Sequence, residues 1–300
     1  MKTKVSHVVL ALLLGIAAGQ ALHAVPSCGN KDFVGVYGML ATGTIIVAPG
    51  FPFGYIGPFA RVGRVVADGH GNLSIANTAS YNGVIIPESY GGTYTVGSDC
   101  TVDAQPVVPL PIGGSIVPVP FEFKGAIADN GDDITMVLCG LGAPCFAAPT
   151  GNVIRIHLSR QDNNQATCTT RDLSGSFQLD MSGSVVSGPA LLPTPPYPQP
   201  PPQSFARDGR LVFDGRGGFS GTAIANTSGF SIQPETMNGQ YSIDPNCNVS
   251  ISFTTVSTST THTWTGTLTD RSNGADLIVA ESGVVIAGML KKQKPGDSYE

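Results

Sequence analysis

The feature that most constrains this chain is an internal duplication. The stretch "FARVGRVVADGHGNLS" begins at Phe59, and a close copy, "FARDGRLVFDGRGGFS", begins at Phe205. Four further blocks recur in the same order, and they begin at Cys28 and Cys168, Gly91 and Asn238, Phe121 and His262, and Gly151 and Gly283. Recurrence in one order indicates that a whole domain was duplicated. We therefore predict two domains, residues 25–161 and 168–293, with a linker at 162–167 and a polar tail at 294–300.

The N-terminus has the pattern of a secretory signal peptide. Residues 1–24 combine the basic start "MKTKVSH", the apolar run "VVLALLLGIAAG", which is too short to span a bilayer, and the small-residue end "QALHA". We expect cleavage after Ala21 or Ala24 and a secreted or periplasmic location. The stretch "VPSC" also resembles a bacterial lipoprotein signal, which leaves a lipid anchor on Cys28 as an alternative.

Charge and hydropathy exclude two classes of partner. Removal of the signal peptide takes away Lys2 and Lys4 and no acidic residue, so the formal net charge goes from −5 to −7. A mildly acidic chain argues against nucleic-acid binding, which depends on neutralising phosphates. No later segment is apolar enough to cross a membrane, and threonine-rich outer faces argue against a transmembrane barrel. We therefore predict a chain that neither binds nucleic acid nor spans a membrane.

The chain has six cysteines. Because an exported protein meets an oxidising environment, we expect these cysteines to form disulfide bonds and not to serve as catalytic or metal-binding residues. Four of them occupy matched positions in the two copies, so each copy is predicted to close on itself. The remaining two lie in the Gly/Pro-rich stretch "CGLGAPC" and have no counterpart. The predicted pairs are Cys28 with Cys100, Cys168 with Cys247, and Cys139 with Cys145.

Apolar residues alternate with period two in each copy, and no stretch holds a helical period. In "HTWTGTLTD", His262, Trp264, Gly266 and Leu268 share one face and threonines take the other. Gly-rich turns such as "DGHG" favour antiparallel neighbours, and closing the sheet removes exposed edges. The predicted fold is all-β, with two tandem eight-stranded antiparallel up-and-down barrels. The strands of the first copy should begin near Phe33, Phe59, Asn72, Thr93, Thr101, Phe121, Ile134 and Val153.

The first strand of each copy resembles a known family. "DFVGVYG" and "DLSGSFQ" are similar to the Gly-x-aromatic first strand of the lipocalin and fatty-acid-binding (calycin) group, with Tyr37 and Phe177 in place of its usual tryptophan. The resemblance implies a lipocalin-like barrel around a small apolar molecule, with a closing basic residue at Arg160 and Lys292. Other stretches, including "GTYTV", look more like exported bacterial proteins of unassigned function.

No constellation of catalytic residues emerges from the sequence. Only His70, His157 and His262 remain after signal removal, and none recurs in the other copy. This excludes a hydrolase triad or a two-histidine metal site in each repeat. The stretches "DGHGN" at Asp68 and "DNGDD" at Asp129 are typical of hairpin turns rather than calcium loops. We predict a non-enzymatic protein without metal or cofactor.

Strand phase assigns a side to each candidate ligand-binding residue. Arg61 and Arg207 lie at matched positions on the same face as apolar residues, while Arg64 and Arg210 lie on the opposite, wet face. An inward arginine could bind a ligand carboxylate, or it could stack on an aromatic ring and close the barrel. The candidate ligand-binding residues are Arg61, Tyr37, Tyr94 and Phe123 in copy one, and Arg207, Phe177, Tyr241, His262 and Trp264 in copy two.

Two functions are consistent with these observations. The first is binding of a small apolar or amphipathic ligand inside one or both barrels. The second is a cell-envelope or extracellular interaction module that uses loops or the outer face and holds no internal ligand. Interior volume distinguishes them, because a barrel packed solid with aromatic side chains has no room for a ligand.

Overall fold

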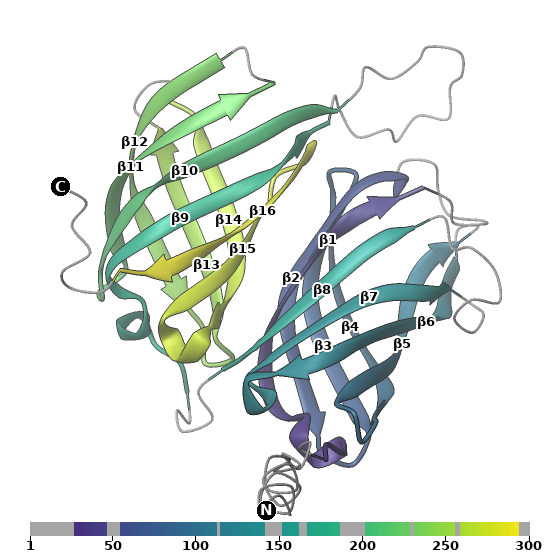
Figure 1. Cartoon of the computed structure of the whole chain (residues 1–300). Helices are drawn as coiled ribbons and strands as arrows, with labels where there is room; N and C mark the ends of the chain where they lie inside the picture. Colours follow the sequence, from purple (N-terminus) through teal and green to yellow (C-terminus); the bar gives the residue numbers. More distant parts are fainter. Residues whose placement is uncertain are drawn as a thin grey trace, which may run out of the picture.

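The computed structural model describes residues 27–46, 55–112, 115–141, 152–161, 167–186, 202–228, 231–255 and 259–293. The predicted signal peptide, linker and polar tail, and the residue Cys145, lie outside these ranges except for residue 167 of the linker. Within them the chain forms two closed antiparallel barrels side by side (Figure 1), made of β1 to β8 and of β9 to β16. The predicted fold class is confirmed. We call these barrel 1 and barrel 2.

Each barrel is an up-and-down meander in which the last strand pairs with the first. The strands of barrel 1 are β1 (Val34–Ile45), β2 (Gly57–Asp68), β3 (Asn72–Tyr81), β4 (Val84–Val96), β5 (Thr101–Ile112), β6 (Ser115–Ala128), β7 (Asp133–Leu141) and β8 (Val153–Arg160). Those of barrel 2 are β9 (Ser174–Val185), β10 (Gln203–Asp214), β11 (Gly218–Thr227), β12 (Ser231–Ile243), β13 (Asn248–Thr255), β14 (Thr261–Thr269), β15 (Gly274–Val279) and β16 (Val284–Lys292). Full closure leaves no sheet edge along the body of either barrel.

Two strands begin earlier than the sequence predicts. β4 begins at Val84 instead of Thr93, and β6 begins at Ser115 instead of Phe121. The missed parts contain Pro87 in β4 and Pro118 and Pro120 in β6, and proline normally argues against a strand because it lacks a donor. These prolines are tolerated because the segments that carry them pair with a neighbouring strand on one side only among the described residues, and no hydrogen bond needs an N–H group on the other side.

A disulfide ties the start of each barrel to the turn between its fourth and fifth strands. Cys28 is bonded to Cys100 and Cys168 to Cys247, across 72 and 79 residues, as predicted. Cys139 is also disulfide-bonded, but its predicted partner lies outside the described residues. The Cys28–Cys100 bond uses the sulfur that a lipid anchor would need, so it argues against that alternative.

One end of each barrel is closed by a single-turn 3-10 helix, η1 (Asn30–Asp32) or η4 (Thr170–Asp172). The hydroxyl of Tyr94 donates to the Phe33 carbonyl at 2.5 Å, and that of Tyr241 donates to the Leu173 carbonyl at 2.8 Å. The basic residue at the end of each copy lies over the aromatic ring of the first strand. The guanidinium of Arg160 lies 5.0 Å from the Tyr37 ring, and the ammonium of Lys292 lies 5.8 Å from the Phe177 ring.

The barrels meet along a seam, which we define as the contact between the outer faces of β1, β2, β3 and β8 and those of β14, β15 and β16. A Cβ at Gly38 would lie 2.6 Å from the Thr269 side chain, so the absence of a side chain there permits the close approach. Thr267 and Thr269 are buried in the seam, although the sequence assigns the threonine face of this strand to solvent. Packing between domains reverses the environment that strand alternation predicts. The apolar part of the seam consists of Ala60, Val62, Val186, Ile278, Val285 and Ala287.

Candidate functional site

The inward arginine of barrel 1 is held in a closed network. Arg61 on β2 is buried, and its Nη2 atom lies 2.7 Å from Glu88 Oε2. Its two terminal nitrogens also donate to the hydroxyls of Tyr90 and Tyr81, each at 2.7 Å. Tyr81 in turn donates to Glu88 Oε1 at 2.7 Å, and Asn77 donates to Tyr90 at 3.1 Å. Both terminal nitrogens of this guanidinium therefore have partners within the protein.

Electrostatics keep this network in one protonation state. Burial lowers the pKa of Arg61, but the neighbouring Tyr81, Tyr90 and Glu88 outweigh it and raise that pKa above its ordinary value. Burial is also the main reason why the pKa of Tyr90 rises to about 12. The guanidinium is charged and the phenols are neutral at physiological pH. The network is therefore a fixed structural element of the barrel interior.

Barrel 2 keeps the arginine and its acid but loses both tyrosines. Arg207 pairs with Glu235 through Nε–Oε2 at 2.9 Å and Nη2–Oε1 at 3.2 Å. Its guanidinium lies 5.1 Å from the Phe205 ring and 5.6 Å from the Trp264 ring. The repeat positions of Tyr81 and Tyr90 carry Thr227 and Met237 in this copy. Arg207 is neutralised by its carboxylate and stacked on aromatic rings.

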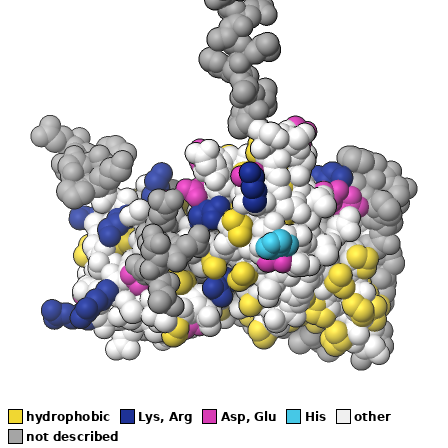
Figure 2. Space-filling model, turned by 90° about the horizontal axis from the view of Figure 1, so that it is seen from below, with side chains coloured by type: hydrophobic (Ala, Val, Ile, Leu, Met, Phe, Trp, Pro, Cys, Tyr) yellow, Lys and Arg dark blue, Asp and Glu magenta, His cyan; other side chains and the backbone are white. Residues whose placement is uncertain are grey.

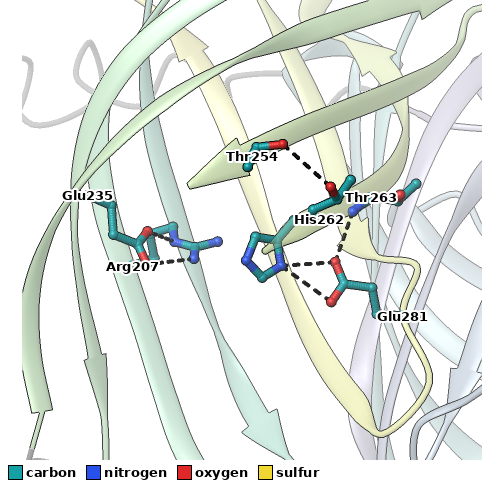
Figure 3. Close-up of polar contacts among 7 residues, drawn as sticks. Arg207, Glu235, Thr254, His262, Thr263 and Glu281 are labelled. Atoms are coloured by element: carbon teal, nitrogen blue, oxygen red, sulfur yellow. Dashed lines mark hydrogen bonds and ion pairs between the residues drawn. The ribbon is translucent and has the colours of Figure 1, made fainter. Parts of the chain in front are cut away.

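A second polar pair lies beside Arg207 and Glu235 (Figure 3). The Nδ1 atom of His262 lies 3.1 Å from Glu281 Oε1, and the Thr263 amide donates to the same oxygen at 2.8 Å. Burial raises the pKa of Glu281, but the bonds from His262 and Thr263 outweigh it and hold that pKa below its ordinary value. Copy one has Phe121 at the position of His262, so this pair is specific to barrel 2.

The acidic partners of the two arginines are the functional residues that sequence reasoning missed. Glu88 lies three residues before Gly91, and Glu235 lies three residues before Asn238, so both occupy the same repeat position. A buried charge needs a partner, and an acid recurring in both copies was the available signal. Glu281 follows β15 and has no repeat counterpart that could have revealed it.

The nine predicted ligand-binding residues are divided between two ends of the barrels. Tyr37, Tyr94, Phe177 and Tyr241 lie at the ends closed by η1 and η4, where they bind carbonyls or stack under a basic residue. The other five residues lie farther from these closed ends, and all but His262 are buried: Arg61, Phe123, Arg207, Trp264 and His262. The structure thus brings together Arg61 with Phe123, and Arg207 with Trp264 and His262.

Two cavities inside barrel 1 are lined by described residues, and both are small. One cavity, lined by Arg61, Tyr81, Phe121 and Phe123 among others, has a volume of about 20 Å³. A second, lined by Phe33, Met39 and Phe123 among others, also measures about 20 Å³. Each has room for about one water molecule. In barrel 2, fully buried aromatic and aliphatic side chains fill the corresponding space, among them Trp264, Phe177, Phe213, Phe253, Leu179 and Met181.

A much larger hollow lies between the two barrels. This inter-barrel groove measures about 380 Å³, within the usual range for small-molecule sites. Its apolar part includes Leu40, Pro58, Ala60, Val285 and Ala287, and its polar part includes the hydroxyls of Thr42, Thr44, Ser182 and Ser184. Asp180 is the one charged side chain among the described lining residues. The groove therefore joins an apolar surface to hydroxyl groups and a carboxylate.

Two kinds of feature are absent from the described ranges. No group of three or more His, Cys, Asp or Glu side chains is placed to hold a metal ion. No helix among the described residues is both long enough and apolar enough to cross a membrane.

Comparisons with known proteins find similarity among solved structures alone. No protein-family model matches the chain, and no curated protein matches its sequence. One similar solved structure is the isotype 1 transferrin binding protein B (TbpB) from serogroup B Neisseria meningitidis, with 7% sequence identity and a TM-score of 0.31. The match covers 89% of this chain and 76% of that chain. The class of this protein, a tandem pair of closed eight-stranded barrels, follows from its own strand pairing.

Proposed function

We propose that this chain is an exported, non-enzymatic binding protein that holds a small amphipathic molecule in the inter-barrel groove. The observation that carries the proposal is the difference in volume between the two kinds of site. The groove measures about 380 Å³, whereas each interior cavity described in barrel 1 measures about 20 Å³. A drug-sized ligand needs a pocket of about 300 Å³ or more.

The state of the two arginines also supports a site outside the barrels. An inward arginine could hold a ligand carboxylate only through donors that are free or can be released. Arg61 is engaged by Glu88 and two tyrosines, and Arg207 by Glu235. A ligand carboxylate would have to displace a protein carboxylate in a buried setting, with no gain in charge pairing. The stacking and barrel-closing role predicted as an alternative accounts for both residues.

The lining of the groove indicates the chemistry of the ligand. Val285, Ala287 and Ala60 offer an apolar surface, while serine and threonine hydroxyls from both barrels can donate or accept hydrogen bonds. Asp180 disfavours an anion and favours an amine or a neutral hydroxyl group. No His, Cys, Lys or Arg is among the described lining residues, so the serine hydroxyls have no base beside them to activate them. These features support binding without catalysis.

Tryptophan substitutions on the two groove walls test the proposal. The probe is the neutral amphipathic dye Nile red, titrated by fluorescence against the natively exported protein. Ser182→Trp and Thr42→Trp, which fill the groove from opposite barrels, should each weaken binding at least about tenfold, or about 1.4 kcal/mol. The control Ser252→Trp places the same side chain on an exposed position of β13 and should bind like the parent.

Two results would decide against the groove. If both groove variants bind as well as the parent while Arg207→Leu loses binding, the ligand lies inside barrel 2. If the parent binds no amphipathic probe, and mass spectrometry finds no small molecule on the exported protein, the interaction-module alternative is the better function.

One observation favours that alternative. Residues 107–112 of β5 and 115–120 of β6 pair only with each other among the described strands, and the outer face of this two-stranded ribbon carries Val107 and Ile116 at 41% and 69% exposure. Figure 2 shows hydrophobic side chains gathered on one side of the surface, at the right. Exposed apolar patches of this kind often mark protein contacts. A protein partner that docks here should be lost with Ile116→Lys and retained with the groove variants.

A further inference from the structure

The outer face of β15 carries one carboxyl group into the seam between the barrels. Asp276 is 4% exposed, and its register partners are Thr267 on β14 and Met289 on β16, neither of which is charged. Its Oδ2 atom is buried without a hydrogen-bond partner among the described residues. Because an ionised carboxylate in such a place lacks compensation, the position favours the neutral, protonated acid.

Two titratable side chains of barrel 1 act on Asp276 across the seam. His157 on β8 and Asp133 on β7 form a pair, with 2.9 Å between Nε2 and Oδ1. Burial is the main reason why the pKa of Asp276 rises to about 7; the charge of His157 lowers that pKa and the charge of Asp133 raises it. The proton on Asp276 therefore depends on groups from the other barrel.

The remaining elements around Asp276 add two charged side chains. Arg64 lies on the outer face of β2, and Lys291 on β16 pairs with Gly274, two residues from Asp276. The charges that act most on the pKa of Asp276 are those of His157 and Asp133. β1 brings Val36, Gly38 and Leu40 to its outer face, and β14 brings threonines, none of them titratable.

An unused acceptor lies in the same part of the seam. The side-chain nitrogen of Gln161 donates to Thr267 Oγ1 at 2.7 Å and to the Leu268 carbonyl at 2.8 Å. Its Oε1 atom is buried and has no partner among the described residues. Thr267 stands opposite Asp276 in the β14–β15 ladder. A protonated carboxyl can donate a hydrogen bond here, whereas an ionised carboxylate can only accept one.

We propose that the seam is a pH-responsive joint, in which protonated Asp276 holds the two barrels together and its ionisation loosens their contact. The pKa of Asp276 is about 7 in the folded chain against an ordinary value of 3.8. Between these values the folded chain keeps a proton that the unfolded chain has released. Stability therefore falls as pH rises from about 4 to about 7 and stays at its lower level above that. The joint is tight near pH 5 and loose near pH 8.

The joint should also affect ligand binding in the inter-barrel groove, an inference that rests on the proposed function. Ala60, Val285 and Ala287 belong both to the seam and to the groove lining. Loosening of the seam at higher pH therefore changes the groove walls and should weaken a bound amphipathic molecule. The joint itself does not depend on any ligand, so it is tested on the protein alone.

Hydrogen–deuterium exchange of the full chain tests the joint. Near pH 8, peptides from β14 and β15 should exchange at least about tenfold faster in the parent than in Asp276→Asn, because the amide imitates the neutral acid. Near pH 5 the two should exchange alike, and comparing them at equal pH cancels the intrinsic rate. The control Asp208→Asn removes an exposed carboxylate on β10, outside the seam and the groove, and should match the parent at both pH values. Peptides from β12, away from the seam, should show no difference.

Two charge variants retain Asp276 and keep the test decisive if Asp276→Asn folds poorly. Asp133→Asn removes the charge that raises the pKa of Asp276, so the pH midpoint of loosening should move down. His157→Gln removes the charge that lowers it, so the midpoint should move up. A carboxyl with only a packing role predicts no movement in either variant. Unmoved midpoints, or equal exchange in the parent and Asp276→Asn near pH 8, would overturn the joint.

Discussion

Each barrel contains a buried arginine–glutamate ion pair at the same repeat position, and the two barrels surround this pair with different side chains. Arg61 and Glu88 in barrel 1 are enclosed by Tyr81 and Tyr90, which bond to both terminal nitrogens of Arg61 and, through Tyr81, to Glu88. Arg207 and Glu235 in barrel 2 have no such tyrosines and rest on aromatic rings. The part common to both copies is the arginine with its acid, so we infer that this pair serves the fold. What differs between the copies is the capacity of the surroundings to satisfy it.

The largest expected effect comes from removing either acid. Glu88→Leu and Glu235→Leu should each destabilise the protein by about 3 to 5 kcal/mol, because each leaves a buried guanidinium without its carboxylate. Replacing both members of the pair should affect stability differently in the two barrels. Arg207→Leu with Glu235→Leu should recover most of the loss, whereas Arg61→Leu with Glu88→Leu should not, since it removes the guanidinium that donates to the Tyr81 and Tyr90 hydroxyls and the carboxylate that accepts from Tyr81. Chemical denaturation monitored by tryptophan fluorescence and circular dichroism measures both. Equal recovery in the two barrels would contradict the comparison.

A smaller effect is expected from the tyrosine that distinguishes barrel 1. Tyr81→Phe removes one acceptor from Arg61 and one donor to Glu88, so it should cost about 1 to 3 kcal/mol. The matched change in barrel 2, Thr227→Val, touches no bond of the ion pair and should stay within about 0.5 kcal/mol. Urea denaturation of the two variants provides the measurement. A cost at Thr227 as large as that at Tyr81 would mean that barrel 2 satisfies its arginine in the same way.

The His262–Glu281 pair should give barrel 2 an acid sensitivity of its own. The pKa of Glu281 is held below its ordinary value of 4.5, so its contribution to stability is present above that value and is lost as pH falls below it. Glu281→Gln should therefore lower the melting temperature above about pH 4.5 and change it little below that pH, so that the fall on acidification becomes flatter. A melting profile between about pH 3 and 7 tests this. An unchanged acid limb in Glu281→Gln would show that the pair contributes nothing.

Proline substitutions in the ribbon of barrel 1 should have the smallest effect on stability and a measurable effect on self-association. β4 pairs with β5 only as far as Pro106, and β7 pairs with β6 only as far as Phe121, so both ribbon edges are free among the described residues. Pro109 faces Pro118 across the ribbon, at positions whose N–H groups would point to those edges. Proline there removes the donors that would recruit another strand. Pro109→Thr with Pro118→Thr should change the melting temperature little and increase self-association, measured by light scattering. The corresponding hairpin of barrel 2, formed by β13 and β14, is shorter and has no proline in its strands. It serves as the reference, because a short edge without proline offers few groups to another strand.

Local patterns in the sequence determined the architecture of each copy. Alternation with period two is a property of neighbouring residues, so it placed Arg61, Arg207 and most of the aromatic residues inside before any contact was known. Duplication paired Cys28 with Cys100 and Cys168 with Cys247 for the same reason, because matched positions are visible along the chain. The same patterns could not show that Glu88 and Glu235 lie beside the arginines, since each of those contacts crosses an intervening strand.

Only the tertiary structure decided what surrounds each barrel. Strand phase assigns Thr267, Thr269 and Asp276 to an outer face, and nothing in the sequence indicates that another barrel covers that face. The groove arises because two closed, convex surfaces touch along the seam and leave space beside it, and the buried state of Asp276 arises from the contact itself. Both depend on how two finished domains pack against each other, which short-range periodicity does not encode.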